Sequence, residues 1–173
     1  TWQRSSSKSS WEAYPTGQNE VLRLTQSQVG YSYRAVVSYI DSHGTREVLY
    51  TSPSETIDNL DDPVQGEVTI IGEPKEGVTL RALSNSLSDE DGIASISISW
   101  ETSKDGRNWV GVNSLSGPVL SLSQSLVGSQ VRARVAVVDN FGIETNLYSQ
   151  ATRTVENVNN KPSGRIVIRR VGQ

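Results

Sequence analysis

The chain repeats itself at a fixed interval, and this repeat constrains its fold more than any other feature of the sequence. Trp2 and Trp100 are 98 residues apart (100 − 2 = 98), and Gly30 and Gly128 have the same separation. Further pairs at this interval are Trp11 with Trp109, Asp41 with Asp139, Tyr50 with Tyr148 and Asn59 with Asn157. Short solenoid repeats run about 20–50 residues, so the longer interval predicts a tandem array of domains.

Two polar stretches that contain proline set the phase of the repeat. Residues 59–63 read Asn-Leu-Asp-Asp-Pro, and residues 157–162 read Asn-Val-Asn-Asn-Lys-Pro. These stretches predict one complete repeat over 59–156. Residues 1–58 are then the C-terminal part of a preceding repeat, and 157–173 are a linker and the first strand of a following one. The chain begins with Thr, and we expect it to be a piece of a longer protein.

The local pattern within the complete repeat is that of β-strands. Residues 67–71, 78–83, 96–100 and 130–137 alternate apolar with polar side chains, which places one face of each strand in a core. An Asp-Gly pair at 105–106 between two such runs predicts a hairpin. About seven short strands in such a repeat indicate an all-β sandwich of immunoglobulin, fibronectin or cadherin type.

The composition excludes several function classes. The chain has no Cys and a single His, which argues against disulfides, thiolate metal sites and catalysis that depends on several histidines. A net charge of −3 argues against nucleic acid as a partner. No apolar run reaches the roughly 20 residues of a membrane helix, so we expect no membrane insertion. Neither copy of the repeat carries a recognisable acid/base pair, nucleophile set or phosphate loop, and we expect the protein not to be an enzyme.

Four stretches carry motifs in a fixed order. Residues 99–109 read Ser-Trp-Glu-Thr-Ser-Lys-Asp-Gly-Arg-Asn-Trp, residues 122–128 read Leu-Ser-Gln-Ser-Leu-Val-Gly, and residues 138–142 read Val-Asp-Asn-Phe-Gly, followed by the stretch at 157–162. In this order the chain resembles the immunoglobulin-like or cadherin-like tandem repeats of giant bacterial surface proteins, including the repeat adhesins exported by type I secretion. Residues 89–92, Asp-Glu-Asp-Gly, are similar to the Asp-x-Asp-Gly loop of that family. The resemblance implies an extracellular location at the bacterial cell surface.

A cluster of carboxylates is the main candidate site. In such a sandwich, the loops at 88–92 and 138–142 lie at the end where the chain enters through residues 59–63. Ca²⁺ takes about 6–8 oxygen ligands, and carboxylates packed together repel one another without a cation. The sequence therefore suggests that Ca²⁺ stiffens the junction, and the alternative is that these are ordinary turn residues. The candidate ligands are Asp61, Asp62, Asp89, Asp91 and Asp139.

Two function classes follow from these observations. The first is a structural spacer whose partners are neighbouring repeats of the same chain. The second is a module that binds a cell-surface glycan or protein, with Trp109 as a ring on which a sugar can stack. The repeat favours the spacer, because Trp11 and Trp109 occupy equivalent positions, as a shared core requires. Trp2 and Trp100 lie on the predicted third strand, where a sandwich buries a Trp between its sheets.

Overall fold

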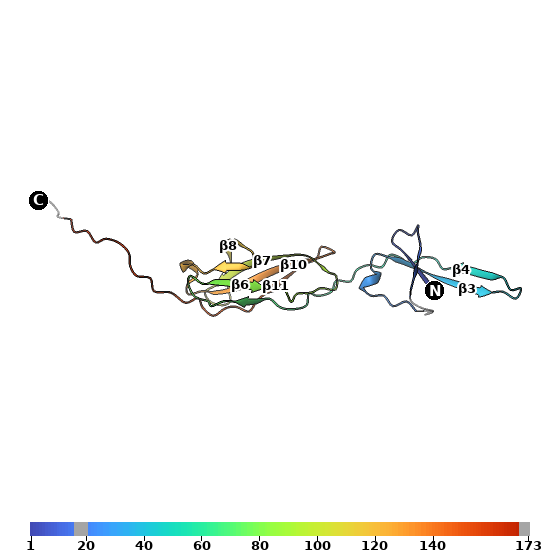
Figure 1. Cartoon of the computed structure of the whole chain (residues 1–173), viewed down its shortest axis with the longest axis horizontal. Coiled ribbons are helices and arrows are strands. Elements are labelled where there is room, and N and C mark those ends of the chain that lie inside the picture. Colours follow the sequence, from blue (N-terminus) through green and yellow to red (C-terminus); the bar gives the residue numbers. More distant parts are fainter. Residues whose placement is uncertain (16–20, 170–173) are drawn as a thin grey trace. The chain divides into compact units, whose positions relative to one another are not determined.

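The computed structural model describes residues 1–15 and 21–169. These residues form β-strands joined by turns and two short 3₁₀ helices, with no α-helix among them. The prediction of an all-β fold is therefore confirmed. The chain divides into two compact units, one containing Thr1–Pro63 with the short Asp89–Gly92 turn and the other containing Val64–Ser88 and the chain from Ile93 onward. Figure 1 shows the strands of both units.

The strands of the first unit form one antiparallel sheet. Its order is β2-β1-β3-β4, and a 3₁₀ helix, η1 (Gln26–Gln28), precedes β3. Tyr33 is buried, whereas Val37, Tyr39 and Leu49 are each at least half exposed. Within the described residues, this sheet has no second sheet packed on it, which explains the exposure of these side chains. The strands are β1 (Trp2–Ser5), β2 (Glu12–Tyr14), β3 (Ser32–Ile40) and β4 (Arg46–Tyr50).

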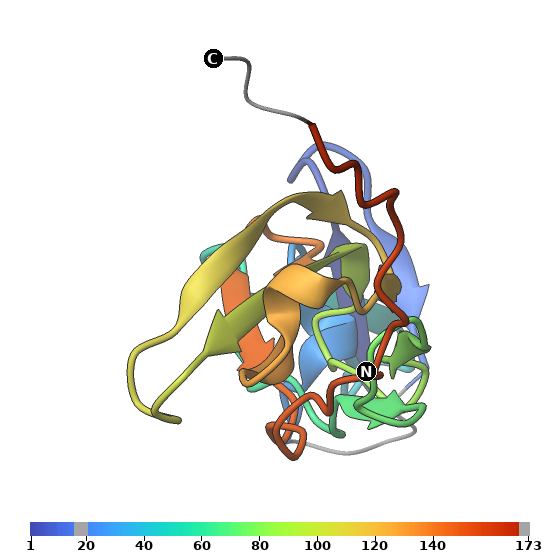
Figure 2. The ribbon, with the colours of Figure 1, turned by 90° about the vertical axis from the view of Figure 1, so that its left-hand side faces the viewer.

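The strands of the second unit form two antiparallel sheets. One has the order β11-β10-β7-β8, and the other has the order β5-β6-β9 (Figure 1 and, from the end, Figure 2). This pairing of a four-stranded with a three-stranded sheet is a sandwich of the immunoglobulin-like kind. The strands are β5 (Thr69–Ile71), β6 (Thr79–Leu83), β7 (Ile93–Ser103), β8 (Val110–Ser116), β9 (Val119–Ser121), β10 (Gln130–Asp139) and β11 (Glu144–Tyr148), with the 3₁₀ helix η2 (Gln124–Leu126) before β10.

The core of the second unit lies between its two sheets. Trp100 on β7 is 1% exposed, and its indole Nε1–H donates to the Gly117 carbonyl at 3.0 Å. The predicted alternation is clearest on β10, where buried and half-buried residues follow one another along the whole strand. The expectation of a buried Trp between the sheets is thus confirmed for Trp100, whereas Trp2 of the first unit is only half-buried. The other core residues are Val68, Leu80, Ala82, Leu120, Leu122, Leu126, Val131, Ala133, Val135, Val137 and Val155.

The predicted hairpin at 105–106 joins β7 to β8. Asp105 organises the turn, because its Oδ1 accepts from the Arg107 and Asn108 amides at 2.9 and 2.8 Å and from the Ser103 hydroxyl at 2.9 Å. These hydrogen bonds hold the pKa of the Asp105 carboxyl well below its usual value, with the Asn108 amide contributing most. Gly106 supplies the positive φ of 71° that the turn needs.

Gly66 permits a close backbone approach, and a side chain there is expected to cost stability. Its φ is +98°, and an added Cβ would lie 2.3 Å from the Ser86 carbonyl oxygen. We expect Gly66→Ala to lower the free energy of unfolding by about 3 kcal/mol, because strain and a backbone clash add. Gly128→Ala is the matched control, because its φ is +78° but nothing lies within 4 Å, and it should cost about 1 kcal/mol. Urea denaturation measures both, and equal losses would contradict the clash.

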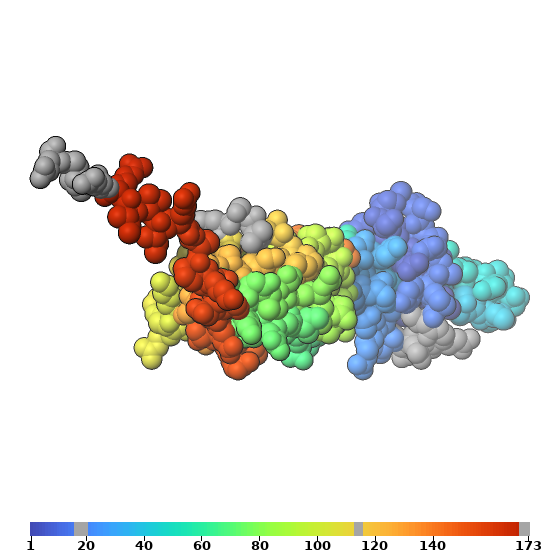
Figure 3. Space-filling model, turned by 60° about the vertical axis from the view of Figure 1, so that its left-hand side comes forward, coloured from blue at the N-terminus to red at the C-terminus, as the bar shows by residue number. Residues whose placement is uncertain are grey.

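The predicted first strand of a following repeat, within 157–173, is described by the structure only as far as residue 169. Residues 163–169, in the red segment of Figure 3, carry no regular secondary structure, and Ile166 and Ile168 are each 95% exposed. Residues 170–173 of the predicted strand lie outside the described residues.

Candidate metal centre

The loop before β7 presents the first carboxylate of the site. The main-chain N–H of Asp91 donates to Asp89 Oδ1 at 2.8 Å, and Gly92 N–H donates to the Asp89 carbonyl at 3.1 Å. This compact turn, with Gly92 at a φ of +79°, directs the Asp91 side chain inward, where the residue is only 3% exposed. Asp89 therefore shapes the loop and uses a carboxylate oxygen to do so.

The end of β10 presents the second carboxylate. Asp139 is the last residue of the strand, follows the core-facing series of β10 and is 4% exposed. Its Oδ1 accepts from the Phe141 and Ile143 amides, both at 2.8 Å, which closes the turn to β11. Asp139 pairs with Ile93 at the start of β7, so the strand register places it beside the loop that carries Asp91.

The segment at 61–62 contributes the third carboxylate and a main-chain donor. Asp62 N–H donates to Asp91 Oδ2 at 2.9 Å, which fixes the segment to the loop. One carboxylate oxygen from each of Asp61, Asp91 and Asp139 lies within 4.8 Å of the other two. Two oxygens bound to the same Ca²⁺ are at most about 5 Å apart, since each lies about 2.3–2.6 Å from the ion. The three carboxylates therefore have a spacing that one Ca²⁺ can bridge.

Two oxygens of this cluster have no partner in the described part of the chain. Asp91 Oδ1 and Asp139 Oδ2 are buried and accept no hydrogen bond there, while the other oxygen of each residue is occupied by amide donors. A buried carboxylate oxygen without a donor is costly, and neighbouring carboxylates add repulsion. A divalent cation would remove both costs. Asp61 is exposed and is the most accessible of the three groups.

The structure divides the five predicted ligands into two groups. Asp61, Asp91 and Asp139 come together, as expected from the loop arrangement. Asp62 and Asp89 are not among the clustered carboxylates of the described residues, and their observed roles are an amide donation and a turn. The division follows from local hydrogen bonding, which composition and spacing do not reveal.

Trp11 and Trp109 lie outside the core of buried residues, contrary to the preferred prediction. Trp109 is half-buried on the outer side of its sheet, with the Arg132 guanidinium 4.3 Å from the ring centroid. Arg132 also lies 4.2 Å from the Tyr148 ring and forms an ion pair with Glu101 at 2.6 Å. The first unit has the same arrangement, and its Arg34 lies 4.4 Å from each of the rings of Trp11 and Tyr50.

This stack accounts for the repeated position of the Trp residues. Cation–π contacts stabilise an arginine held over an aromatic ring. Arg132 already covers one face of the Trp109 ring, so a sugar cannot stack on that face. The signal in the sequence is that arginine and tyrosine recur at the same 98-residue spacing as the tryptophans, at Arg34 with Arg132 and Tyr50 with Tyr148.

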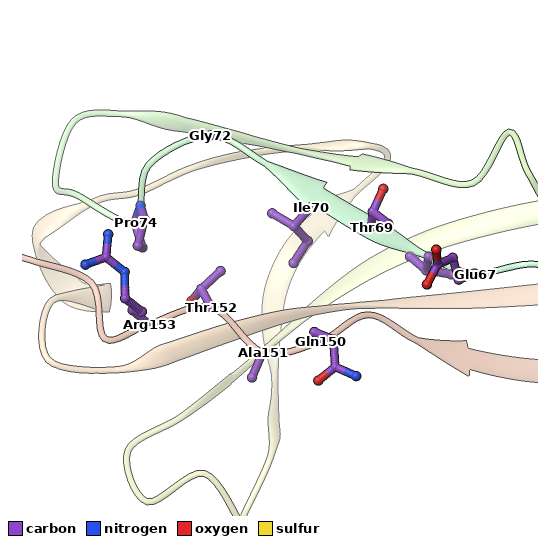
Figure 4. A pocket seen from close by; sticks show the side chains of 10 residues that line it. Glu67, Thr69, Ile70, Gly72, Pro74, Gln150, Ala151, Thr152 and Arg153 are labelled. Carbon is purple, nitrogen blue, oxygen red and sulfur yellow. The ribbon is translucent and has the colours of Figure 1, made fainter.

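A cavity of about 420 Å³ lies on the flank of the second unit (Figure 4). One wall is the segment from Glu67 to Pro74 with β5, and the other is residues 150–153 after β11. None of its ten lining residues is aromatic, and its charged lining residues are Glu67 and Arg153. The cavity lies between β5, which pairs with β6, and residues 150–153, of which Thr152 hydrogen-bonds to Val131 on β10 of the four-stranded sheet. Its lining offers no cluster of groups for catalysis or for metal binding.

Of three comparisons with known proteins, only the one with solved structures gives a match. No family model and no curated protein sequence matches the chain. A crystal structure of domains from titin is a similar solved structure, with 14% sequence identity and a TM-score of 0.37. The match covers 90% of this chain and 54% of the titin chain, so this chain spans about half the length of the titin structure. A likeness at this level carries no argument about function. No helix among the described residues is long and apolar enough to span a membrane.

Proposed function

We propose that the chain is part of a tandem array of immunoglobulin-like sandwiches in a large extracellular bacterial surface protein, where it acts as a structural spacer. The 98-residue repeat supports this proposal. So do the matching turns at Asp41 and Asp139, in which an Asp Oδ1 accepts two amides, at 2.8 Å in every case. A spacer requires the fold to recur along the chain, whereas a dedicated binding site does not.

Calcium binding by Asp61, Asp91 and Asp139 is the second part of the proposal. The two buried oxygens of Asp91 and Asp139 that accept no hydrogen bond from the described residues carry it, because buried polar atoms in stable folds normally have a partner. The bound ion would hold the 59–63 segment against the 89–92 loop, adding to the hydrogen bond from Asp62 N–H. The segment that leads into the complete sandwich would then be stiff in calcium and looser without it.

Titration with calcium tests this function directly. We expect isothermal calorimetry of the metal-free chain to show saturable binding of about one ion. At free Ca²⁺ about 100 times the dissociation constant, the fold that carries the site should gain about 2.7 kcal/mol in the free energy of unfolding. That gain corresponds to a rise in melting temperature of about 10 °C or more for a unit of about 100 residues.

Magnesium at the same concentration is the control. It keeps its waters and a strict octahedral geometry, so it should give a much smaller rise. Absence of both binding heat and a calcium-dependent melting shift would refute the calcium site.

A further inference from the structure

The chain leaves the second unit along a short parallel pairing. Glu156 N–H donates to the Pro74 carbonyl at 2.8 Å, and Glu76 N–H donates to the Glu156 carbonyl at 2.9 Å. Lys75 and Glu156 form the corresponding parallel bridge. In a parallel ladder, the next donor along the leaving strand is the N–H of residue 158, and its regular acceptor is the main-chain carbonyl of Glu76.

The side chain of Glu76 takes the place of that carbonyl. The chain turns sharply at 75–78, where Val78 N–H donates to the Lys75 carbonyl at 3.0 Å and Gly77 has a φ of +81°. Gly77 N–H donates to the Leu122 carbonyl, so at this residue the main chain no longer pairs with the segment around Glu156. Val158 N–H instead donates to Glu76 Oε2 at 3.0 Å. The carboxylate thus extends the ladder by one residue beyond the point where the backbone departs.

Further amide groups converge on the same carboxylate. Asn160 Nδ2 donates to Glu76 Oε1 at 3.3 Å. The Gln124 side-chain amide lies beside the same carboxylate and donates to Asn157 Oδ1 at 3.1 Å; with its nitrogen and oxygen exchanged, the nitrogen would lie 2.8 and 3.1 Å from the two Glu76 oxygens. These donors are uncharged amides, and Glu76 does not belong to the acidic cluster found among the described residues. Hydrogen bonds to a charged acceptor are about twice as strong as those between neutral groups.

We propose that Glu76 is a metal-independent clamp whose carboxylate fixes residues 157–160 to the second unit, so that this segment keeps its path when divalent cations are removed. Asn159 and Asn160 stand one repeat after Asp61 and Asp62 and bring no carboxylate. The segment that leaves the second unit, residues 157–160, is therefore held by amide groups that donate to the Glu76 carboxylate. The segment that enters it, residues 59–63, would be held by carboxylates that bind a cation. This contrast rests on the proposed calcium function, but the clamp itself does not.

Amide hydrogen exchange, measured by NMR on the whole chain, tests the clamp at the Val158 N–H. We expect Glu76→Ala to raise the exchange rate of Val158 by roughly tenfold or more, because its charged acceptor is lost. The Thr152 amide, which donates to the Val131 carbonyl at 2.8 Å, should keep its rate and so report that the sandwich remains folded. Glu73→Ala, at an exposed position on the same loop, is the matched control and should leave Val158 unchanged.

Glu76→Gln keeps one acceptor oxygen and should raise the Val158 rate by only about threefold, since a neutral acceptor forms a weaker hydrogen bond. If Glu76→Ala also speeds exchange at the Thr152 amide, which would mean that the sandwich has unfolded, the Glu76→Gln variant tests the clamp in its place. A Val158 rate unchanged in both variants overturns the clamp. A rise in Val158 exchange on adding EDTA to the unsubstituted chain overturns its independence from metal. Failure of the calcium function has a different signature, because EDTA would then leave Asp62 N–H exchange unchanged while Glu76→Ala still releases Val158.

Discussion

Replacement of Trp100 with Ala should lower the free energy of unfolding of the second unit by about 3–5 kcal/mol. Trp100 is 1% exposed at the centre of the core, so its removal leaves a cavity between the two sheets. The change also removes the indole N–H donor to the Gly117 carbonyl, a further cost of about 1 kcal/mol. Domains are stable by only about 5–15 kcal/mol, so this variant should be unfolded in part at 37 °C.

Trp109→Ala is the matched control for this prediction. It deletes a side chain of the same size, but one that lies half-buried under a guanidinium on the outer side of the sheet. We expect a loss of about 1–2 kcal/mol, from one cation–π contact and part of the apolar burial. Urea denaturation followed by far-UV circular dichroism measures both variants. Equal losses would mean that the outer stack supports the fold as much as the core does.

Several strands of the second unit were predictable because alternate residues along them are buried, as on β6, β9 and β10. A period of two survives in the sequence wherever a core selects every second side chain, and β10 shows this along its full length. The strand ends were less predictable. β7 begins at Ile93 and β5 at Thr69, because pairing partners and not the alternation decide where a ladder starts.

The role of Trp109 shows what a repeat cannot decide. Equivalent positions in two repeats share an environment, but that environment can be a core or an exposed sheet surface. Arg132 alternates outward on β10 and occupies the space over the ring. The sequence places an arginine and a tyrosine at the same repeat spacing, so the stack was visible only once the strand faces were known.

The sequence predicted which three segments form the site but not which of their carboxylates come together. The order of strands in a sandwich brings residues 61, 91 and 139 to one end, which the sequence alone implied. The choice among five carboxylates depends on which oxygens the amides occupy. Asp89 Oδ1 accepts from the Asp91 amide, and Asp62 donates its main-chain N–H to Asp91 Oδ2. Only this hydrogen-bond geometry distinguishes Asp62 and Asp89 from the three clustered carboxylates.

Asp139→Asn is expected to change stability in opposite directions with and without calcium. Without calcium, the variant should be more stable than the natural chain by about 1 kcal/mol, because one of the facing buried charges is removed. The Asn carbonyl oxygen can still accept from the Phe141 and Ile143 amides, so the turn is kept. The new side-chain NH₂ also brings a donor into the cluster, where Asp91 Oδ1 lacks a partner in the described residues.

With calcium present, the same substitution should remove most of the stabilisation. The ion loses a charged ligand, and the NH₂ group of Asn cannot coordinate it, so the gain of about 2.7 kcal/mol at 100 times the dissociation constant should fall below about 1 kcal/mol. Melting curves of the whole chain in EDTA and in calcium measure both effects. Asp41→Asn is the matched control, because Asp41 forms the same turn with the His43 and Thr45 amides but does not belong to the cluster.

The reversal of sign separates a calcium site from a turn that merely contains aspartates. If Asp139 served only the turn, Asp139→Asn would behave like Asp41→Asn, and calcium would affect neither melting curve. If the cluster binds calcium, the two variants diverge, and the natural chain becomes the most stable of the three only when the ion is present. A substitution that stabilises the metal-free protein while destabilising the calcium-bound one identifies charge repulsion among buried carboxylates as what the cation relieves.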